Sequence, residues 1–267
     1  MNMKIGFIGC GNMASAIIGG IIKGGLYAPD AITASDASPA ARDAAKEKFG
    51  IAVTEDNKAN ASGADILFLS VKPQYFPEVI EEIKDSVRDE TVVVSIAPGL
   101  KLEKLYAMFG RTLKIVRVMP NTPALVGEGM SGICSGELVT EAELKNVIAI
   151  FESCGKAEIV PEKLMDTVVA VSGSSPAYAF MFIEAMADAA VIGGMPRLQA
   201  YRFAAQAVLG SAKMVLETGK HPGELKDMVC SPAGTTIQAV RVLEDMGFRS
   251  AVIEASEACR EKSEELG

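Results

Sequence analysis

A glycine-rich turn, Gly9-Cys10-Gly11-Asn12-Met13-Ala14, lies between two apolar segments of different periodicity. Before it, Lys4–Ile8 alternates like a strand, and after it Ala14–Lys23 repeats apolar residues with the spacing of a helix. In this context G-x-G-x-x-G/A is a dinucleotide-binding pattern. Gly9 permits the tight turn, Gly11 lets the backbone approach a pyrophosphate, and Ala14 lets the helix pack close to the strand. We therefore predict a pyrophosphate site at the helix N-terminus.

Apolar runs and helical patterns alternate through the first half of the chain. The expected strands are Lys4–Ile8, Ala31–Ala34, Ile66–Val71, Thr91–Ile96 and Lys114–Val118, and the expected helices are Ala14–Lys23, Pro39–Phe49, Pro77–Val87 and Leu102–Phe109. Runs such as ILFLSV and TVVVSI are apolar on both faces, as parallel strands are when helices cover both sides of their sheet. The alternation predicts an α/β fold with a Rossmann-type doubly wound sheet.

The composition and the hydrophobic pattern of the sequence change from about Glu162 onward. Strand patterns stop, and Ala, Met, Leu and Gly dominate long windows such as Ala177–Ile192 and Leu198–Glu217. Apolar residues cover most of the circumference of these helices, so we expect a second copy of the chain to bury them. We predict a dinucleotide-binding domain over residues 1–162 and an all-helical dimerisation and substrate-binding domain over residues 163–267. The alternative for the second part is a monomeric helical bundle.

The composition excludes several classes of protein. The 26 Lys and Arg residues against 34 Asp and Glu residues give a net charge of −8, which argues against a nucleic-acid or anionic-membrane binder. Five widely spaced cysteines without a C-x-x-C pattern indicate reduced thiols in a cytoplasmic protein. The single histidine, His221, allows no zinc site, and we expect no metal. No uninterrupted apolar stretch reaches the roughly 18 residues that a transmembrane helix needs.

The second expected strand ends at Ser35-Asp36, where the adenosine ribose of a dinucleotide should lie. Asp36 is able to accept a hydrogen bond from the 2′-hydroxyl and would repel a 2′-phosphate, which slightly favours NADH. Ser35 and Ser38 are instead able to donate to that phosphate, which favours NADPH. The alternative role for Asp36 is to cap the helix that begins at Pro39. The expected cofactor is therefore NADPH or NADH.

Two further strands end in loops of small or polar residues. Val71-Lys72-Pro73 and Ala97-Pro98-Gly99 follow expected strands directly. Ligands of open α/β sheets bind beyond the carboxyl ends of the strands, so both loops should border the ribose and nicotinamide. Lys72 is either a contact to phosphate or ribose or a solvated loop lysine.

The second half of the chain favours an imine as the substrate. Reduction of a ketone needs a proton donor, and no lysine occurs between Lys163 and Lys213. A protonated imine already carries its proton. The small-residue loop Cys230–Thr236 precedes a helical pattern, and its free N–H groups with the hydroxyls of Ser231, Thr235 and Thr236 would suit a carboxylate. The alternative is an ordinary helix cap.

Several motifs together resemble those of pyrroline-5-carboxylate reductases. They are His221-Pro222-Gly223-Glu224-Leu225-Lys226-Asp227, Ser231-Pro232-Ala233-Gly234-Thr235-Thr236, Ser172-Gly173-Ser174-Ser175-Pro176-Ala177-Tyr178, Val71-Lys72-Pro73 and Arg117-Val118-Met119-Pro120-Asn121-Thr122-Pro123. The resemblance spans essentially the whole chain. It implies an NAD(P)H-dependent reduction of 1-pyrroline-5-carboxylate to L-proline by a homodimer, with larger rings of dimers in some cases.

The resemblance also implies roles for individual residues. Thr236 would lie near the ring nitrogen and is the predicted catalytic residue. Apart from the resemblance, the position of His221 before Pro222-Gly223 predicts a helix-start or surface histidine rather than a proton donor. The predicted substrate-binding residues are Glu162, Ser231, Gly234, Thr235 and Thr236. The predicted cofactor-binding residues are Gly9, Cys10, Gly11, Asn12, Met13, Ser35, Asp36, Asn57, Val71, Lys72, Pro73, Ala97, Pro98 and Gly99.

Three residues depart from the pattern of that family, and two other functions compete with it. Ser175 replaces a glycine, Asp36 stands where a neutral residue is expected, and Pro98 replaces an alanine and so lacks a backbone donor. One competing function is another imine or 3-hydroxyacid dehydrogenase, and the latter would need a catalytic lysine. The other is a non-catalytic dinucleotide sensor, which would need no carboxylate site.

Overall fold

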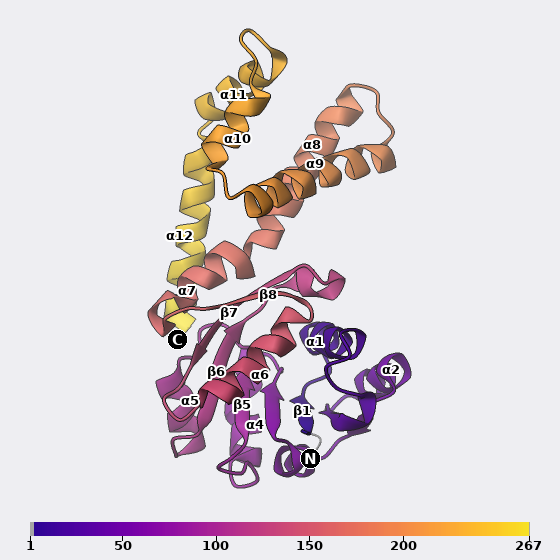
Figure 1. The fold of residues 1–267 in the computed structure, drawn as a ribbon, viewed down its shortest axis with the longest axis vertical. Coiled ribbons are helices and arrows are strands. Elements are labelled where there is room, and N and C mark those ends of the chain that lie inside the picture. The colour runs from indigo at the N-terminus through magenta and orange to yellow at the C-terminus, as the bar shows by residue number, and fades with distance from the viewer. Residues whose placement is uncertain (1–2, 267) are drawn as a thin grey trace. The chain divides into compact units, whose positions relative to one another are not determined.

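The computed structural model describes residues 3–266, which form two compact units. The first unit holds residues 3–174 and 259–266, and the second holds residues 175–258 (Figure 1). The boundary between the units lies after residue 174 and not at the predicted domain boundary after residue 162. The helical residues 163–174 belong to the same compact unit as the sheet.

The first unit is built on one eight-stranded sheet with the order β3-β2-β1-β4-β5-β6-β7-β8. Its strands are β1 Ile5–Ile8, β2 Ile32–Ser35, β3 Ala52–Thr54, β4 Ile66–Leu69, β5 Val92–Ser95, β6 Lys114–Met119, β7 Gly129–Ser135 and β8 Gly155–Ile159. All neighbouring strands are parallel except β6 and β7. The order reverses direction between β1 and β4, which is the switch point of a doubly wound fold. The predicted Rossmann-type sheet is confirmed.

Helices of the first unit cover both faces of the sheet. They are α1 Asn12–Lys23, α2 Pro39–Phe49, α3 Asn57–Gly63, α4 Phe76–Ile83, α5 Leu102–Phe109, α6 Glu141–Glu152 and α7 Met165–Val168, with short 3₁₀ turns η1 Pro29–Ala31, η2 Pro73–Tyr75, η3 Thr122–Val126 and η4 Glu162–Leu164 and the π-helix η5 Val169–Gly173. Side chains of β1 and β4 alternate between two buried layers. Phe7 and Phe68 stack at 4.5 Å on one face, while Ile8 and Leu69 pack on the other.

Five elements of this unit lie outside the predicted pattern, namely β3, α3, β7, α6 and β8. The strands β3 and β8 are the partly exposed edges of the sheet, so neither carries an apolar run. Glycines interrupt β7 because neighbouring side chains come close: a Cβ on Gly132 would lie 2.8 Å from Cγ1 of Val168. The sequence pattern did not reveal these contacts because they depend on distant residues.

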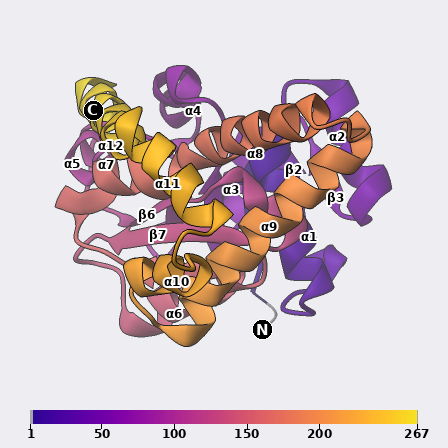
Figure 2. The same ribbon diagram turned by 90° about the horizontal axis from the view of Figure 1, so that it is seen from above.

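The second unit contains only helices. These are α8 Ser175–Ile192, α9 Arg197–Thr218, α10 Pro222–Val229, α11 Thr235–Asp245 and most of α12 Phe248–Leu266. Helices α8 and α9 pack side by side (Figures 1 and 2). Few side chains are buried: α8 buries only Ala187, and α9 only Ala200 and Ala204. Large apolar side chains are exposed, including Phe180, Met181, Phe203 and Leu216.

The stretch Glu162–Ile192 is long and apolar enough to cross a membrane by length and composition alone. Its mean hydropathy is 1.3, and only 6% of its most apolar window is buried within this chain. The same exposed apolar surface is what an interface between two copies requires.

Candidate active site

The glycine-rich turn is fixed between the ends of β1 and β4. Gly9 has φ +104°, and a Cβ there would lie only 2.7 Å from the carbonyl oxygen of Ser70. The Gly9 N–H donates to the carbonyl of Ser35 at 2.7 Å. The Ser70 hydroxyl lies 2.9 Å from the carbonyl oxygens of both Ile8 and Gly9. Only glycine fits at position 9, and Ser70 is a supporting residue that the sequence pattern did not reveal.

The N-terminus of α1 is open. Gly11 is its N-cap, no side chain caps the helix, and a Cβ on Gly11 would meet nothing within 4 Å. Gly11 and Asn12 are exposed, whereas Ala14 is fully buried against the sheet. Backbone N–H groups in the first turn of a helix bind phosphate well. The residues present therefore fit the pyrophosphate of a dinucleotide.

Asp36 shapes the loop after β2 through both of its carboxylate oxygens. One accepts the N–H of Cys10 and the other the N–H of Ser38, each at 2.8 Å. The cap of α2 is Ser38, whose hydroxyl accepts the N–H of Ala41 at 3.3 Å, so the alternative role of Asp36 as the helix cap is wrong. Asp36 instead ties this loop to the glycine-rich turn.

Cys10 contributes its backbone rather than its thiol to this site. Burial, together with the nearby Asp36 carboxylate, raises the pKa of the Cys10 thiol to about 11. The side chain is only 8% exposed. The thiol is therefore protonated at neutral pH and packs as an apolar group.

Ser35 is the last residue of β2, at the edge of the sheet where the cofactor is predicted to bind, but its side chain points into the protein. It is fully buried, and its hydroxyl donates to Oδ1 of Asn57 at 2.7 Å. Asn60 donates to the same hydroxyl at 3.1 Å, and the amide of Asn57 donates to Glu82 at 2.8 Å. Because Ser35 has no access to solvent, its proposed hydrogen bond to a 2′-phosphate does not fit. Its role is to orient the half-buried Asn57.

The loops after β4 and β5 lie at the same edge of the sheet as the glycine-rich turn. Val71 is half-buried, while Lys72 and Pro73 are exposed and lead into η2. In the other loop Ala97 and Gly99 are buried and Pro98 is half-exposed. The strand order β1-β4-β5 brings these loops together beyond the carboxyl ends of the strands.

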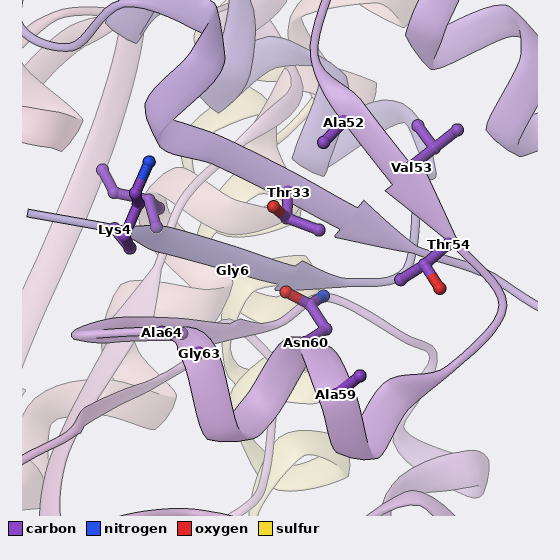
Figure 3. A pocket seen from close by; sticks show the side chains of 11 residues that line it. Lys4, Gly6, Thr33, Ala52, Val53, Thr54, Ala59, Asn60, Gly63 and Ala64 are labelled. Atoms are coloured by element: carbon purple, nitrogen blue, oxygen red, sulfur yellow. The ribbon is translucent and has the colours of Figure 1, made fainter.

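Two cavities of the first unit lie away from this arrangement. One, of about 420 Å³, is lined by small and polar residues of β1, β2, β3 and α3, with Asn60 pointing into it (Figure 3). Lys4 and Gly6 at the start of β1 border it, on the amino side of the glycine-rich turn. The other, of about 590 Å³, lies beside α1 and η3. Neither is lined by the residues predicted to bind cofactor or substrate.

Glu162 ties together three elements of the first unit. Its Oε1 accepts from the Arg117 guanidinium and from the N–H of Leu102, both at 2.7 Å. The Arg117 side chain is 4% exposed and that of Glu162 35%. A buried guanidinium needs such a partner, so Glu162 has a structural task here. Its predicted contact with substrate stays a prediction.

The predicted carboxylate site belongs to the second unit. Ala233 has φ +57°, the Gly234 N–H donates to the carbonyl of Ser231 at 3.0 Å, and α11 begins at Thr235. A Cβ on Gly234 would lie 2.2 Å from Oγ of Ser231, so any side chain at position 234 would clash with the Ser231 hydroxyl in its present position. No side chain caps α11, and within the described part of the chain the hydroxyls of Thr235 and Thr236 make no hydrogen bond.

This N-terminus differs from that of α10 in the same unit. There, His221 is the N-cap, and its Nδ1 accepts the N–H of Gly223 at 3.0 Å. The prediction that His221 begins a helix is confirmed. Whereas α10 is closed by its own cap, α11 presents free N–H groups and two threonine hydroxyls, which is the arrangement that a carboxylate requires.

Comparisons with known proteins match both halves of the chain. Residues 162–266 match the family described as pyrroline-5-carboxylate reductase dimerisation, and residues 4–99 match NADP oxidoreductase, coenzyme F420-dependent. The pyrroline-5-carboxylate reductase of Escherichia coli K12 is 57% identical over 266 residues, which is 100% of this chain and 99% of that protein.

Solved structures give the same result. A pyrroline-5-carboxylate reductase from Coxiella burnetii has a TM-score of 0.92 at 37% identity, covering 100% of this chain and 99% of the other. The pyrroline carboxylate reductase of Plasmodium falciparum, solved with NADP bound, has a TM-score of 0.91 at 36% identity, covering 100% and 98%. This chain therefore belongs to the pyrroline-5-carboxylate reductase family.

Proposed function

We propose that the open N-terminus of α11 holds the carboxylate of 1-pyrroline-5-carboxylate, the ring imine that this chain reduces. The chain is an NAD(P)H-dependent oxidoreductase of the CH–NH class, and its product is L-proline, at the last step of proline biosynthesis. The observation that supports the carboxylate site is the uncapped first turn of α11, with Thr235 and Thr236 free to bind.

The proposed chemistry needs positioning and electrostatics rather than a strong acid. The substrate is a protonated imine, so hydride addition at the imine carbon, C2 of its ring, leaves a neutral secondary amine. The bound nicotinamide supplies that hydride from its C4 position. The free N–H groups of Thr235 and Thr236 fix the carboxylate beside Gly234, and the Thr236 hydroxyl hydrogen-bonds to the ring nitrogen. Such orientation contributes roughly 7–11 kcal/mol to lowering a barrier.

In this proposal the residues that hold the cofactor come from the carboxyl edge of the sheet. Gly11, Asn12 and Met13 at the start of α1 bind the pyrophosphate. Asp36 and Asn57 face the adenosine ribose, and the loops at Val71–Pro73 and Ala97–Gly99 border the nicotinamide half. The dinucleotide part of the function is thus assigned to residues 1–162, and the dimer and carboxylate parts to residues 163–267.

The direct test is the loss of absorbance at about 340 nm when purified protein meets 1-pyrroline-5-carboxylate and NADH or NADPH. We expect oxidation of the cofactor with stoichiometric formation of proline. Binding of both cofactors without oxidation of either would contradict the proposal. An inactive sample that binds neither cofactor would instead point to damaged protein, which a melting curve identifies.

We further predict that Asp36 biases the chain toward NADH. Its carboxylate is held in place by the N–H groups of Cys10 and Ser38, so it cannot turn away from a 2′-phosphate. In Asp36→Asn we expect the ratio of kcat/KM for NADPH to kcat/KM for NADH to rise about tenfold, because removal of one repulsive charge is worth about 1.4 kcal/mol here. Steady-state kinetics with both cofactors measures this ratio, and an unchanged ratio would remove Asp36 from the ribose site.

The dimerisation match supports a homo-oligomer, and we propose that its dimers assemble into a larger ring in the cytoplasm. The exposed apolar helices of the second unit would form the dimer interface, and free cysteines suit a reducing compartment. Light scattering gives the mass as a multiple of 28.1 kDa, and a mass of two chains would rule out the ring.

A further inference from the structure

The last turn of α12 packs on the loop that follows β5, within the first unit. A Cβ on Gly99 would lie 3.1 Å from Cβ of Leu266 and 3.4 Å from the carbonyl oxygen of Ser263. Gly99 is buried and has φ +76°, a conformation that favours glycine. The glycine at this position therefore allows the close approach of the end of α12.

A buried hydrogen bond holds that turn of α12 in place. Oγ of Ser263 donates to Oδ1 of Asp166 at 2.6 Å, although the two residues are 97 positions apart. Ser263 is 3% exposed and Asp166 is 8% exposed. One turn earlier in α12, Sγ of Cys259 lies 3.2 Å from Oγ of Ser174. The hydrogen bond from Ser263 satisfies the buried carboxylate of Asp166 and stabilises the docked turn of α12.

The same short segment also holds the other end of the loop. Glu162 precedes Asp166 by four residues, and its Oε1 accepts the N–H of Leu102, the first residue of α5. The chain between Gly99 and Leu102 is thus fixed at both ends by groups on η4 and α7 and by the end of α12. Figure 1 shows the end of α12 beside α7.

The loop has little of its own to keep it in one conformation. Pro98 is its half-exposed residue and has no N–H to donate, while Ala97 and Gly99 carry no polar side chain. Its shape therefore depends on what packs behind it. At the carboxyl end of β5, two strands from the switch point, this loop borders the nicotinamide half of a bound dinucleotide.

We propose that Ser263 and Asp166 are positioning residues for the nicotinamide end of the cofactor, acting through Gly99. This proposal rests on the proposed function, because the loop matters to catalysis only if a nicotinamide lies against it. The hydrogen bond between Ser263 and Asp166 keeps the last turn of α12 on Gly99, and that contact keeps Pro98 in the position against which the nicotinamide packs.

The test is Ser263→Ala, read first without substrate. We expect the NADPH dissociation constant, measured by fluorescence titration, to rise about fivefold, and amide hydrogen exchange at residues 97–102 of the cofactor-free protein to accelerate at least threefold. In steady-state assays KM for NADPH should rise while KM for the imine stays within twofold. Ser263→Thr retains a hydroxyl and should recover most of the affinity.

The matched control is Ser256→Ala on the same helix. Its hydroxyl donates only to the carbonyl of Val252 at 2.9 Å, so every readout should stay at the wild-type value. A second variant, Asp166→Asn, keeps an acceptor for Ser263 and should lie between Ser263→Ala and the wild type.

The two proposals fail in different ways. A lower melting temperature for Ser263→Ala with unchanged NADPH affinity and unchanged exchange at residues 97–102 would overturn the positioning role and leave a structural one. Wild-type protein that binds NADPH but does not oxidise it with 1-pyrroline-5-carboxylate would overturn the proposed function instead.

Discussion

Thr236→Ala should lower kcat/KM for 1-pyrroline-5-carboxylate by about 10- to 100-fold while leaving the affinity for NADPH unchanged. The hydroxyl of Thr236 stands at the uncapped start of α11 and makes no hydrogen bond within the described chain. It is therefore available to the ring nitrogen and carboxylate of the substrate. A hydrogen bond to a charged group contributes about 1.5–3 kcal/mol, which corresponds to this loss. Initial rates over a range of imine concentrations measure it.

The split between kcat and KM shows what the hydroxyl does. A lower kcat means that the hydrogen bond to nitrogen strengthens as the amine forms, and a higher KM alone means that Thr236 only binds the carboxylate. Thr236→Ser keeps the hydroxyl and should retain most of the activity. Wild-type kinetics in Thr236→Ala would remove this residue from the site.

His221→Ala is the matched control, since it alters another helix N-terminus of the same unit. His221 caps α10 through Nδ1, so its loss should cost about 1 kcal/mol of stability without lowering turnover. A large loss of activity in this variant would count against a mechanism that needs no histidine.

Gly11→Ala should weaken binding of NADH and NADPH by about 10- to 100-fold and leave the fold intact. Position 11 has ordinary backbone angles, with φ −71°, and a Cβ there would meet no atom of the chain within 4 Å. The protein therefore tolerates the methyl group at a cost of no more than about 1 kcal/mol. The space that the methyl group would take is the space through which a pyrophosphate approaches the first N–H groups of α1. Fluorescence titration gives the affinity.

Gly9→Ala provides the contrast, because here the methyl group meets the protein itself. With φ +104° and a Cβ only 2.7 Å from the carbonyl of Ser70, alanine is strained at this position. We expect a destabilisation of about 1–3 kcal/mol, with a fall in Tm of about 2–4 °C for each kcal/mol. Equal stability losses in Gly9→Ala and Gly11→Ala would contradict the assignment of position 11 to the ligand.

Local sequence patterns predicted most strands and helices of the first unit, because its central strands are apolar on both faces. The expected helix bounds Pro39–Phe49 and Leu102–Phe109 agree with α2 and α5. The edge strands β3 and β8 were missed, since an exposed strand carries no apolar run. The roles of Ser35 and Asp36 also needed the structure, because whether a polar side chain faces a ligand or its own backbone depends on the neighbouring elements.

Some features of this protein follow from its sequence alone. The glycine-rich turn between strand and helix, the alternating α/β series and the small-residue loop before α11 depend on contacts between near neighbours, so spacing and residue type determine them. Only the tertiary structure decides that Ser263 meets Asp166 and that Leu266 lies on Gly99. These pairs join residues that are distant along the chain and belong to no local pattern. Their meeting depends on how the helices and the sheet pack, because burial and not spacing selects such partners.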